Sequence, residues 1–204
     1  MNMTNVLYTI GHSTHSTETV IKLLRLHEIR TVADVRSHPY SRLNPQFNRE
    51  SFSQLLESIG IRYVYLGREL GARPADPTCY VDGKVAYDLL AQTPLFRSGL
   101  DRVVQLASTH RVALMCAEKD PIVCHRAILI CRHLVERGWR CYHILEDGRL
   151  ESHDDALSRL LEELKLPTIP LFREVVIEAY SKRSQQIAST ESFTQHTSVR
   201  RGER

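Results

Sequence analysis

The sequence predicts an α/β fold in which a mostly parallel sheet of about five strands carries helices on both faces. Short apolar runs typical of buried strands alternate with segments whose apolar residues recur at helical spacing. Such alternation is typical of parallel sheets, whose strands are buried on both sides. The chain has 204 residues, of which 42% are hydrophobic, so it can form one domain with an ordinary core.

Five segments have the composition of strands. They are short, rich in Val, Ile, Leu and Tyr, and bounded by polar residues or glycine. The expected strands cover residues 6–10, 31–35, 61–66, 111–115 and 140–145. An Asp147-Gly148 pair after the fifth strand indicates a tight turn.

The expected helices begin at capping residues and end near glycine. Ser16 caps the first helix and Asn48 the second, which Gly60 closes. Thr93 and Pro94 are typical of the cap and first turn of a third. Further helices are expected at 84–91, 124–137, 154–164 and 171–180.

Two segments between these elements lack a regular pattern. Residues 36–47 contain Pro39 and Pro45 and are expected to form a loop. Residues 67–83 contain further glycines and prolines, together with Cys79. Irregular segments of that length are uncommon inside compact domains and often carry function.

The domain is expected to cover residues 1–180, and a disordered basic tail to cover 181–204. The net charge is +3, and the tail alone holds five basic and two acidic side chains. The other 180 residues therefore hold 22 charges of each sign. The basic pI comes from the tail and does not indicate a nucleic-acid-binding domain.

The composition also favours a location in the cytoplasm. No apolar run approaches the roughly 20 residues that span a bilayer, and no secretory signal is recognised, so no membrane partner is expected. The five cysteines are an odd number, which favours free thiols in a reducing compartment.

Polar side chains follow four of the expected strands. Ligands of such folds bind outside the carboxyl ends of parallel strands, which meet at one edge of the sheet. The four segments are Gly11-His12-Ser13, Asp34-Val35-Arg36-Ser37, Gly67-Arg68-Glu69-Leu70-Gly71 and Cys116-Ala117-Glu118. The sequence therefore predicts a functional site at this edge.

The first segment offers a ligand an imidazole from His12 and a hydroxyl from Ser13, with Gly11 allowing close approach of the backbone. The alternative is a turn with a solvated histidine. Glu69 is a candidate general acid or base, or the partner of an arginine from the preceding loop.

The second segment and the loop after it are rich in arginine. Arg36 and Arg42 are suited to holding phosphate or carboxylate groups, and Asp34 and Ser37 lie beside them in the sequence. Phe47 is a candidate for stacking on a base or ring. The alternative is that Asp34 pairs internally with an arginine and that the other charges are solvated.

The densest cluster runs from Cys116 to Arg126. In one interpretation Cys116 or Cys124 is a nucleophile, His125 or Glu118 moves protons, and Arg126 holds an anion. Placing Cys124 at a helix N-terminus favours its thiolate.

Two other interpretations of this cluster stay open. Cys116, Cys124 and His125 are candidate metal ligands, with His12 or Glu118 as a fourth. Neighbouring helical residues point about 100° apart, which makes chelation by Cys124 and His125 awkward. The cysteines are otherwise buried small apolar residues.

Four stretches of the chain resemble domain-of-unknown-function family 488. They are Tyr8-Thr-Ile-Gly-His-Ser13, Asp34-Val-Arg-Ser37 with Pro45 to Asn48, Tyr65-Leu-Gly67 with Glu69-Leu-Gly71, and Leu114-Met-Cys-Ala-Glu118 through Cys124-His-Arg126. Family membership implies no settled activity, although some relatives are linked to DNA repair.

A looser similarity is to rhodanese and cysteine-phosphatase folds, in which a strand, a cysteine, a loop and a helix follow an Asp-Val-Arg strand end. Asp34, Cys116 and Arg126 follow that order. The loop between Cys116 and Arg126 departs from the pattern, because it is long and lacks glycine.

Taken together, the residues favour an enzyme that acts on an anionic, phosphate-bearing ligand such as a nucleotide or a nucleic-acid component. Cys116, Glu118, Cys124 and His125 would be catalytic, and Arg36, Arg42 and Arg126 would hold the anion. The alternatives are a non-catalytic ligand or nucleic-acid binding module, related to DNA repair, and a metal protein. No cofactor, metal ligand or oligomeric state is assigned.

Overall fold

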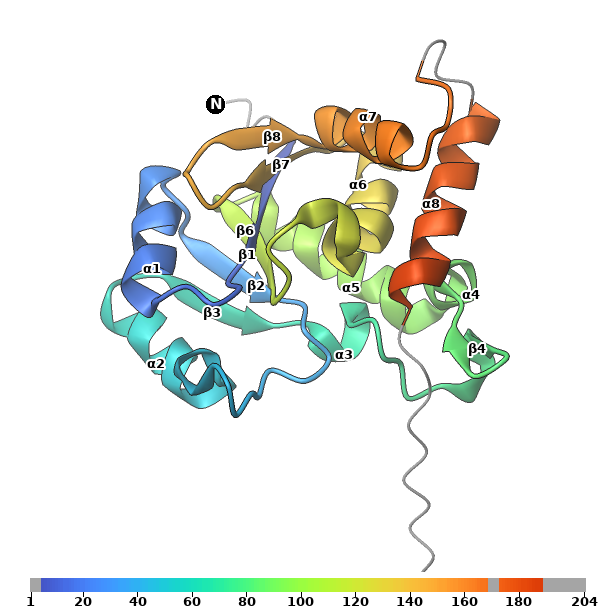
Figure 1. The fold of residues 1–204 in the computed structure, drawn as a ribbon. Coiled ribbons are helices and arrows are strands. Elements are labelled where there is room, and N and C mark those ends of the chain that lie inside the picture. The colour runs from blue at the N-terminus through green and yellow to red at the C-terminus, as the bar shows by residue number, and fades with distance from the viewer. Residues whose placement is uncertain (1–4, 169–172, 189–204) are drawn as a thin grey trace, which may run out of the picture.

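The computed structural model describes residues 5–168 and 173–188 and contains a six-stranded sheet in the order β3-β2-β6-β1-β7-β8 (Figure 1). The strands are β1 (Val6–Gly11), β2 (Thr31–Asp34), β3 (Arg62–Tyr65), β6 (Val112–Cys116), β7 (Arg140–Ile144) and β8 (Leu150–Ser152). All neighbouring strands are parallel except β7 and β8. The predicted α/β class with a mostly parallel sheet is confirmed.

The sequence analysis missed β8. This strand has only three residues, forms the edge of the sheet and is partly exposed, so it lacks the apolar run that marks the other strands. It pairs with β7 through the predicted Asp147-Gly148 turn, in which Gly148 has a φ of 84°.

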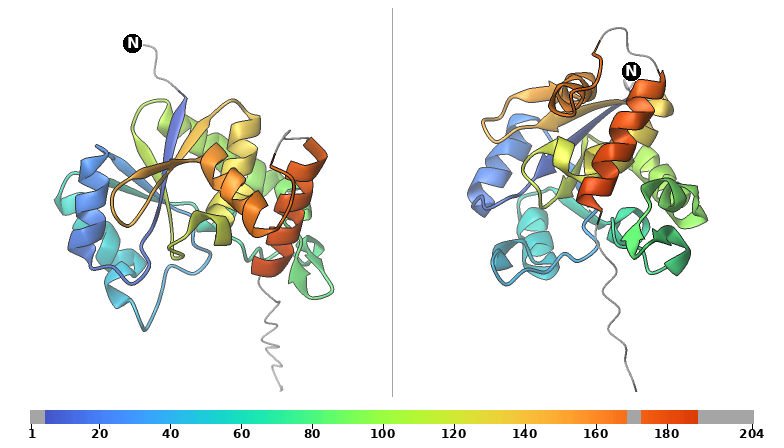
Figure 2. Two further views of the ribbon diagram at one scale, coloured as in Figure 1. Left: turned by 45° about the horizontal axis from the view of Figure 1, so that its top comes forward. Right: turned by 45° about the vertical axis from the view of Figure 1, so that its right-hand side comes forward.

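Helices cover both faces of the sheet (Figures 1 and 2). One face packs against α1 (Thr17–Leu26) and α2 (Arg49–Ser58), which enclose the smaller core cluster. The other face is covered by α3 (Gly67–Leu70), α4 (Tyr87–Gln92), α5 (Pro94–Ala107), α6 (Arg132–Glu136), α7 (His153–Glu163) and α8 (Arg173–Ile187).

Successive residues of the central strands enter opposite core clusters. In β6, Val112 and Leu114 pack on the side of α5, whereas Ala113 and Met115 pack on the side of α1. This two-residue period is the geometry of a strand buried on both faces, and it explains why the strands are continuous apolar runs.

The helix predicted over 84–91 is divided in the structure. Lys84–Val85 form β5, which pairs with β4 (Tyr80–Val81), and α4 starts only at Tyr87. Asp82 and Gly83 join the two strands with φ values of 49° and 72°, as a two-residue hairpin turn requires. The Asp-Gly pair was a hairpin signal that the helical reading overlooked.

The segment predicted as a loop over 67–83 is also more ordered than expected. It contains α3 and a short 3₁₀ turn, Pro77–Cys79, before β4. A similar 3₁₀ turn, Pro45–Phe47, lies in the loop after β2.

The helix predicted over 124–137 begins later and is irregular. It opens as a π-helix, Arg126–Cys131, in which the Arg132 N–H donates to the Ala127 carbonyl, and continues as α6. Cys124 is extended, with φ of −131° and ψ of 139°, but its carbonyl accepts from the Ile128 N–H at 3.1 Å and its sulfur accepts from the Arg126 N–H at 3.5 Å. These are the bonds of an N-cap residue, so the prediction that Cys124 lies at the helix N-terminus is confirmed.

Two predicted caps differ in detail. Asn48 lies at the N-terminus of α2, but its side-chain oxygen accepts from the Ser41 N–H and does not cap the helix. The helix predicted over 154–164 is α7, and it is capped by Ser152, whose hydroxyl accepts from the Asp155 N–H.

The C-terminal boundary of the ordered domain was placed too early. Helix α8 continues to Ile187, seven residues beyond the predicted end of the domain. Arg183 holds this extension, because its buried guanidinium pairs with Glu163 of α7 at 3.1 Å. The rest of the predicted tail, residues 189–204, lies outside the described residues.

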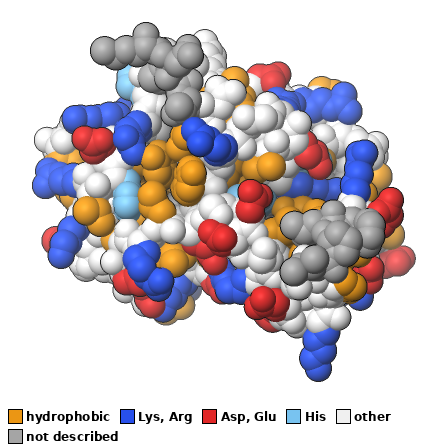
Figure 3. Space-filling model, turned by 90° about the horizontal axis from the view of Figure 1, so that it is seen from above, with side chains coloured by type: hydrophobic (Ala, Val, Ile, Leu, Met, Phe, Trp, Pro, Cys, Tyr) orange, Lys and Arg blue, Asp and Glu red, His pale blue; other side chains and the backbone are white. Residues whose placement is uncertain are grey.

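Among the described residues, every helix is too short or too polar to span a bilayer. All five cysteines are buried and none is in a disulfide. On the face shown in Figure 3, basic and acidic side chains are interspersed around a central hydrophobic area.

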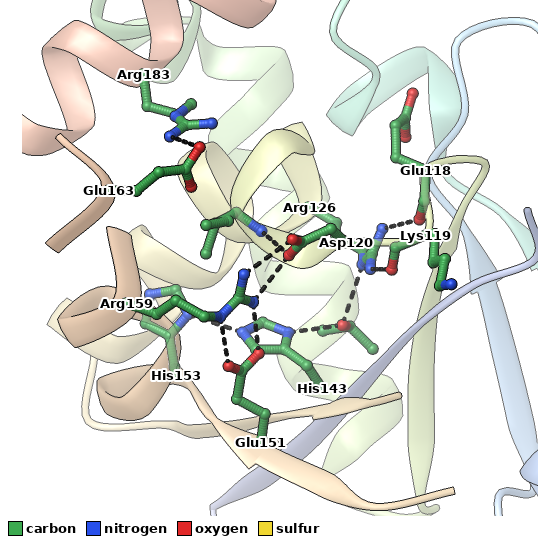
Figure 4. Close-up of polar contacts among 12 residues, drawn as sticks. Glu118, Lys119, Asp120, Arg126, His143, Glu151, His153, Arg159, Glu163 and Arg183 are labelled. Atoms are coloured by element: carbon green, nitrogen blue, oxygen red, sulfur yellow. Dashed lines mark hydrogen bonds and ion pairs between the residues drawn. The ribbon is translucent and has the colours of Figure 1, made fainter. Parts of the chain in front are cut away.

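A chain of hydrogen bonds crosses the larger core cluster from α8 to the π-helix, and Figure 4 shows the part of it that lies between Arg126 and His153. Arg126 Nε donates to Thr9 Oγ1 at 3.3 Å, and Thr9 Oγ1 lies 2.8 Å from His143 Nδ1. His143 Nε2 lies 3.1 Å from His153 Nδ1, and His153 Nε2 lies 2.9 Å from the Tyr180 hydroxyl. Burial keeps both histidines neutral, and Thr9 Oγ1 accepts from Arg126 because arginine can only donate; either tautomer of the two histidines completes the chain.

We expect Tyr180→Phe to lower the free energy of unfolding by about 1–3 kcal/mol, because it leaves the buried His153 Nε2 without a hydrogen-bond partner. Urea unfolding at pH 7.5 measures the change. Tyr40→Phe is the matched control, since the Tyr40 hydroxyl is exposed and bonds the exposed Glu50. Equal effects of the two substitutions would contradict a structural role for the buried chain.

Stability should also fall in acid. Burial lowers the pKa of His153 to about 4, and burial together with the charges of Arg126 and Arg159 lowers the pKa of His143. A histidine whose folded pKa lies below its unfolded value stabilises the fold above about pH 6.5 and loses that contribution as the pH falls towards 4. For His153 the loss is roughly 3 kcal/mol at pH 4. Urea unfolding from pH 7.5 to 4 should show a shallower decline for His153→Gln; a parallel decline would refute the assignment.

Candidate functional site

The segments after β1, β2 and β6 lie side by side because β6 is inserted between the other two strands. The ladders continue beyond the strands: the His12 N–H donates to Cys116 O at 3.0 Å and the Ser13 N–H to Ala117 O at 2.8 Å. On the other side the Val35 N–H donates to Met115 O at 3.1 Å. These three strand ends form the edge where ligands bind in such folds.

A pocket of about 270 Å³ opens over this edge. Cys116, Glu118 and His125 form its floor, and Arg36, Ser37 and Arg73 form part of its wall. Of the predicted catalytic residues, only Cys124 does not line the pocket; it lies behind Cys116 and is 1% exposed.

The predicted catalytic side chains are in contact with one another. Glu118 is exposed as a residue, but its Oε2 accepts from the thiols of Cys116 at 2.8 Å and Cys124 at 3.0 Å. His125 Nδ1 lies 3.6 Å from the Cys116 sulfur and 3.9 Å from the Cys124 sulfur. One donor atom from each of the four residues lies within 4.8 Å of the others, so the cluster could hold a metal ion.

The two thiols ionise differently. Burial raises the pKa of Cys116, and the neighbouring Cys124 raises it further. Burial also opposes ionisation of Cys124, but the hydrogen bond from Cys116 and the charge of Arg126 outweigh it and hold the pKa of Cys124 well below its ordinary value. Burial, then Cys124, raises the pKa of Glu118. Cys124 is therefore the more readily ionised of the two thiols, and it lies among groups that can exchange protons with it.

Arg126 does not hold an external anion. It is fully buried, and its guanidinium donates to Glu118 O at 2.6 Å, Lys119 O at 2.9 Å and Thr9 Oγ1 (Figure 4). The predicted ligand contact is thus replaced by a structural one: Arg126 fixes the loop that carries Glu118.

Gly11 makes this arrangement possible. A Cβ on Gly11 would lie 1.9 Å from the Glu118 carbonyl oxygen, the same oxygen that accepts from Arg126. Only glycine allows the end of β1 and the loop after β6 to approach so closely. On the far side of this loop, Asp120 forms a bidentate pair with Arg159 of α7, with both distances 2.8 Å.

Asp34 and Arg36 form a buried pair, the internal alternative that the sequence analysis left open. Arg36 Nε and Nη2 donate to the two carboxylate oxygens at 2.9 and 2.6 Å. The Tyr63 hydroxyl also donates to Asp34 at 2.6 Å, and Arg36 Nη2 donates to the Phe47 carbonyl. Arg36 still borders the pocket, but its donors are largely occupied.

His12 and Phe47 are buried and do not line the pocket. Their rings stack at 4.3 Å, and Phe47 is 0% exposed, so the prediction that it stacks on a ligand was wrong. His12 Nε2 accepts from Arg36, and burial followed by the Arg36 charge lowers the pKa of His12 to about 4. The solvated histidine of the alternative reading is also excluded, since His12 is 3% exposed.

The other predicted binding residues are more dispersed. Ser13 and Arg42 do not line the pocket over the cluster, and Arg42 is exposed in the loop after β2. Glu69 pairs with Arg102 of α5, not with an arginine of the preceding loop. Ser37 borders the pocket, and its Oγ accepts from the Arg73 N–H at 3.0 Å.

Like His38 and Tyr40, Arg73 lines the pocket but was not predicted as a site residue. It comes from the 67–83 segment, whose length had suggested function without indicating a residue. Gly67 and Gly71 let this segment reach the pocket: added Cβ atoms would lie 1.9 Å from Arg36 O and 2.4 Å from Ser37 Oγ, respectively.

A second pocket of about 690 Å³ adjoins the first and shares Ser37 and Arg73 with it. Tyr65, Arg68 and Glu69 also line it. Arg49 lies over the Tyr65 ring, 4.4 Å from its centroid.

We expect Arg126→Ala to destabilise the fold by about 3–5 kcal/mol, because it removes three buried hydrogen bonds and leaves a cavity. Thermal and urea unfolding measure the loss. Arg149→Ala is the control, since the Arg149 side chain is 78% exposed and pairs with the neighbouring Asp147, and its loss should have little effect on stability. If the Arg126→Ala protein kept its stability and lost only ligand binding, Arg126 would be assigned to the binding site instead.

Comparison with known proteins identifies a family but no activity. A family model described as "Domain of unknown function DUF488" matches residues 16–132, which is more than half of the chain. No curated protein and no solved structure matches the chain. The looser similarity to rhodanese and cysteine-phosphatase folds therefore finds no support.

Proposed function

The chain belongs to the family of domain of unknown function DUF488, and we propose from its site that it is an enzyme acting on an anionic, phosphate-bearing ligand. The observation that carries the proposal is the pocket at the strand ends. Its floor holds the thiol, carboxylate and imidazole groups of Cys116, Glu118 and His125, and an arginine forms part of its wall.

Arg73 is the residue best placed to meet an anion. Its side chain is exposed, and no ion pair or side-chain hydrogen bond engages it among the described residues. Arginine forks bind phosphate bidentately, which supports a phosphate group at the mouth of the pocket.

The adjoining pocket supports a ligand longer than a single phosphate. Arg49 and Arg68 lie at or near it and form no ion pair within the part of the chain that the structure describes. Tyr65 adds an aromatic surface beside them. A nucleotide, or the phosphate end of a nucleic-acid component, would fit a reactive pocket joined to a larger one that carries the arginines Arg68 and Arg73.

The groups on the floor have distinct roles in this proposal. Cys116 is the sulfur that faces the pocket, and Cys124 supports it from behind as the more readily ionised thiol. Glu118, whose pKa is raised by burial, would exchange protons with the ligand as a general acid or base. His125 is fixed below by its bond to the Val35 carbonyl.

We expect Arg73→Gln to weaken binding of nucleoside phosphates by about tenfold or more, the loss of one charge-assisted contact. A panel of nucleotides and phosphorylated metabolites is screened by ligand-induced thermal shift, and the hits are titrated by calorimetry. Arg25→Gln is the matched control, since it removes the same charge from α1, which lines neither pocket.

Two results would count against the proposal. One is a panel in which no phosphorylated compound shifts the wild-type melting temperature. The other is an equal loss of binding in the Arg73 and Arg25 variants, which would show that only the net charge of the protein matters.

A further inference from the structure

The four groups at the floor of the pocket have the composition of a transition-metal site. Two thiols, one imidazole and one carboxylate each offer one donor atom, and these atoms lie within 4.8 Å of one another. Sulfur, nitrogen and oxygen donors in this combination suit zinc, which binds four ligands in a tetrahedron. A tetrahedral zinc ion would place sulfur and nitrogen ligands roughly 3.5 Å apart. The observed separations from His125 Nδ1 to the sulfurs of Cys116 and Cys124 are 3.6 and 3.9 Å.

The orientation of His125 supports this composition. Its Nε2–H donates to the Val35 carbonyl at 3.1 Å, and a carbonyl can only accept. Nδ1 is therefore the nitrogen turned towards the two sulfurs. Histidines that bind metals are typically held in this way, with the second ring nitrogen bonded to a carbonyl or carboxylate.

Cys124 and His125 are adjacent in the sequence, but this does not prevent both side chains from binding one metal ion. The two side chains would diverge by about 100° inside a regular helix. Cys124 instead has extended backbone angles, and His125 comes just before the π-helix that starts at Arg126. The bend between the two residues brings both side chains to Cys116.

The buried charge of Arg126 gives an independent reason for an anionic centre. Its hydrogen bonds go to two carbonyls and one hydroxyl, and among the described residues no carboxylate forms an ion pair with it. A fully buried cation without a neighbouring anion is strongly unfavourable. The Arg126 backbone N–H points to the Cys124 sulfur at 3.5 Å, and the Arg126 guanidinium holds the carbonyl of Glu118, whose carboxylate contacts the same sulfur.

We propose that Cys116, Cys124, His125 and Glu118 bind one zinc ion, with Glu118 as the ligand that faces the pocket. Two thiolates and one carboxylate around a divalent ion leave one net negative charge, which the Arg126 cation balances. The site rests on the proposed function in one respect: an anionic ligand would reach the metal from the side of Glu118. If the ligand displaced Glu118 from the metal, zinc would supply Lewis-acid chemistry to the ligand and the freed carboxylate could exchange protons with it.

The test uses the full chain without a tag, purified under reducing conditions from zinc-supplemented cells. Elemental analysis should give about one zinc per chain. Replacement by Co²⁺ should give a thiolate-to-cobalt charge-transfer band in the near ultraviolet and strong visible bands typical of four-coordinate cobalt. A folded protein, by circular dichroism, with less than about a tenth of a metal ion per chain and no cobalt bands would overturn the proposal.

Three substitutions locate the site. Cys124→Ser should abolish stoichiometric zinc and the charge-transfer band, whereas Cys131→Ala, a buried cysteine further along the same helix, should retain both. Glu118→Gln should retain zinc with weaker affinity and altered visible bands. If the Cys124→Ser protein kept its zinc and the Cys131→Ala protein lost it, the zinc ion would bind at another site and the proposal would be wrong. If Cys124→Ser fails to fold, the wild-type cobalt spectrum still decides the question.

A final arm separates this proposal from the proposed function. Inorganic phosphate is titrated into the cobalt protein, and nucleotides are titrated into zinc-loaded and chelator-treated protein. Metal bound without any response to phosphate or nucleotide would contradict the proposed function and leave the zinc site standing. Nucleotide binding by a chain that binds no metal would overturn the zinc site and leave the proposed function standing.

Discussion

The interaction on which the site depends is the buried guanidinium of Arg126. It joins the end of β1, through Thr9, to the loop after β6, through the carbonyls of Glu118 and Lys119. The loop cannot move without breaking charge-assisted bonds in an environment that excludes water, where each bond is strong and each unpaired group is costly. The position of the Glu118 carboxylate therefore follows from a residue that never reaches the pocket.

Two polar systems share this arginine. Above it lie the thiols, carboxylate and imidazole at the strand ends, and below it runs the line of Thr9, His143 and His153 towards α8. The first system groups acidic and ionisable side chains, and the second consists of hydrogen-bonded groups that burial keeps uncharged. Helix α8 is thus coupled to the base of the pocket through hydrogen bonds and not only through packing.

The fold class could be predicted from the sequence because apolar runs and capping residues are local signals. The order of the strands within the sheet could not be predicted in this way, because the insertion of β6 between β1 and β2 is set by packing over the whole domain. The same distinction applies to the site. The sequence indicated the four clustered side chains because they lie close together in one short stretch, residues 116–125. Arg126 and Phe47 were given the wrong roles because burial decides whether an arginine or a phenylalanine meets a ligand, and burial is a property of the fold.

The π-helix after His125 has a consequence for how relatives of this chain can diverge. A π-helical turn differs from an α-helical one by a single inserted residue and often occurs at functional sites. Deleting one residue between Ala127 and Cys131 would restore regular helical pairing and could leave α6 in its packing position. It would also rotate everything before the deletion by about 100° about the helix axis. A relative whose helix is one residue shorter would therefore keep the fold, but its cysteine and histidine would point away from Cys116. The length of this helix thus distinguishes relatives in which the four side chains meet from relatives that have the same residues without the cluster.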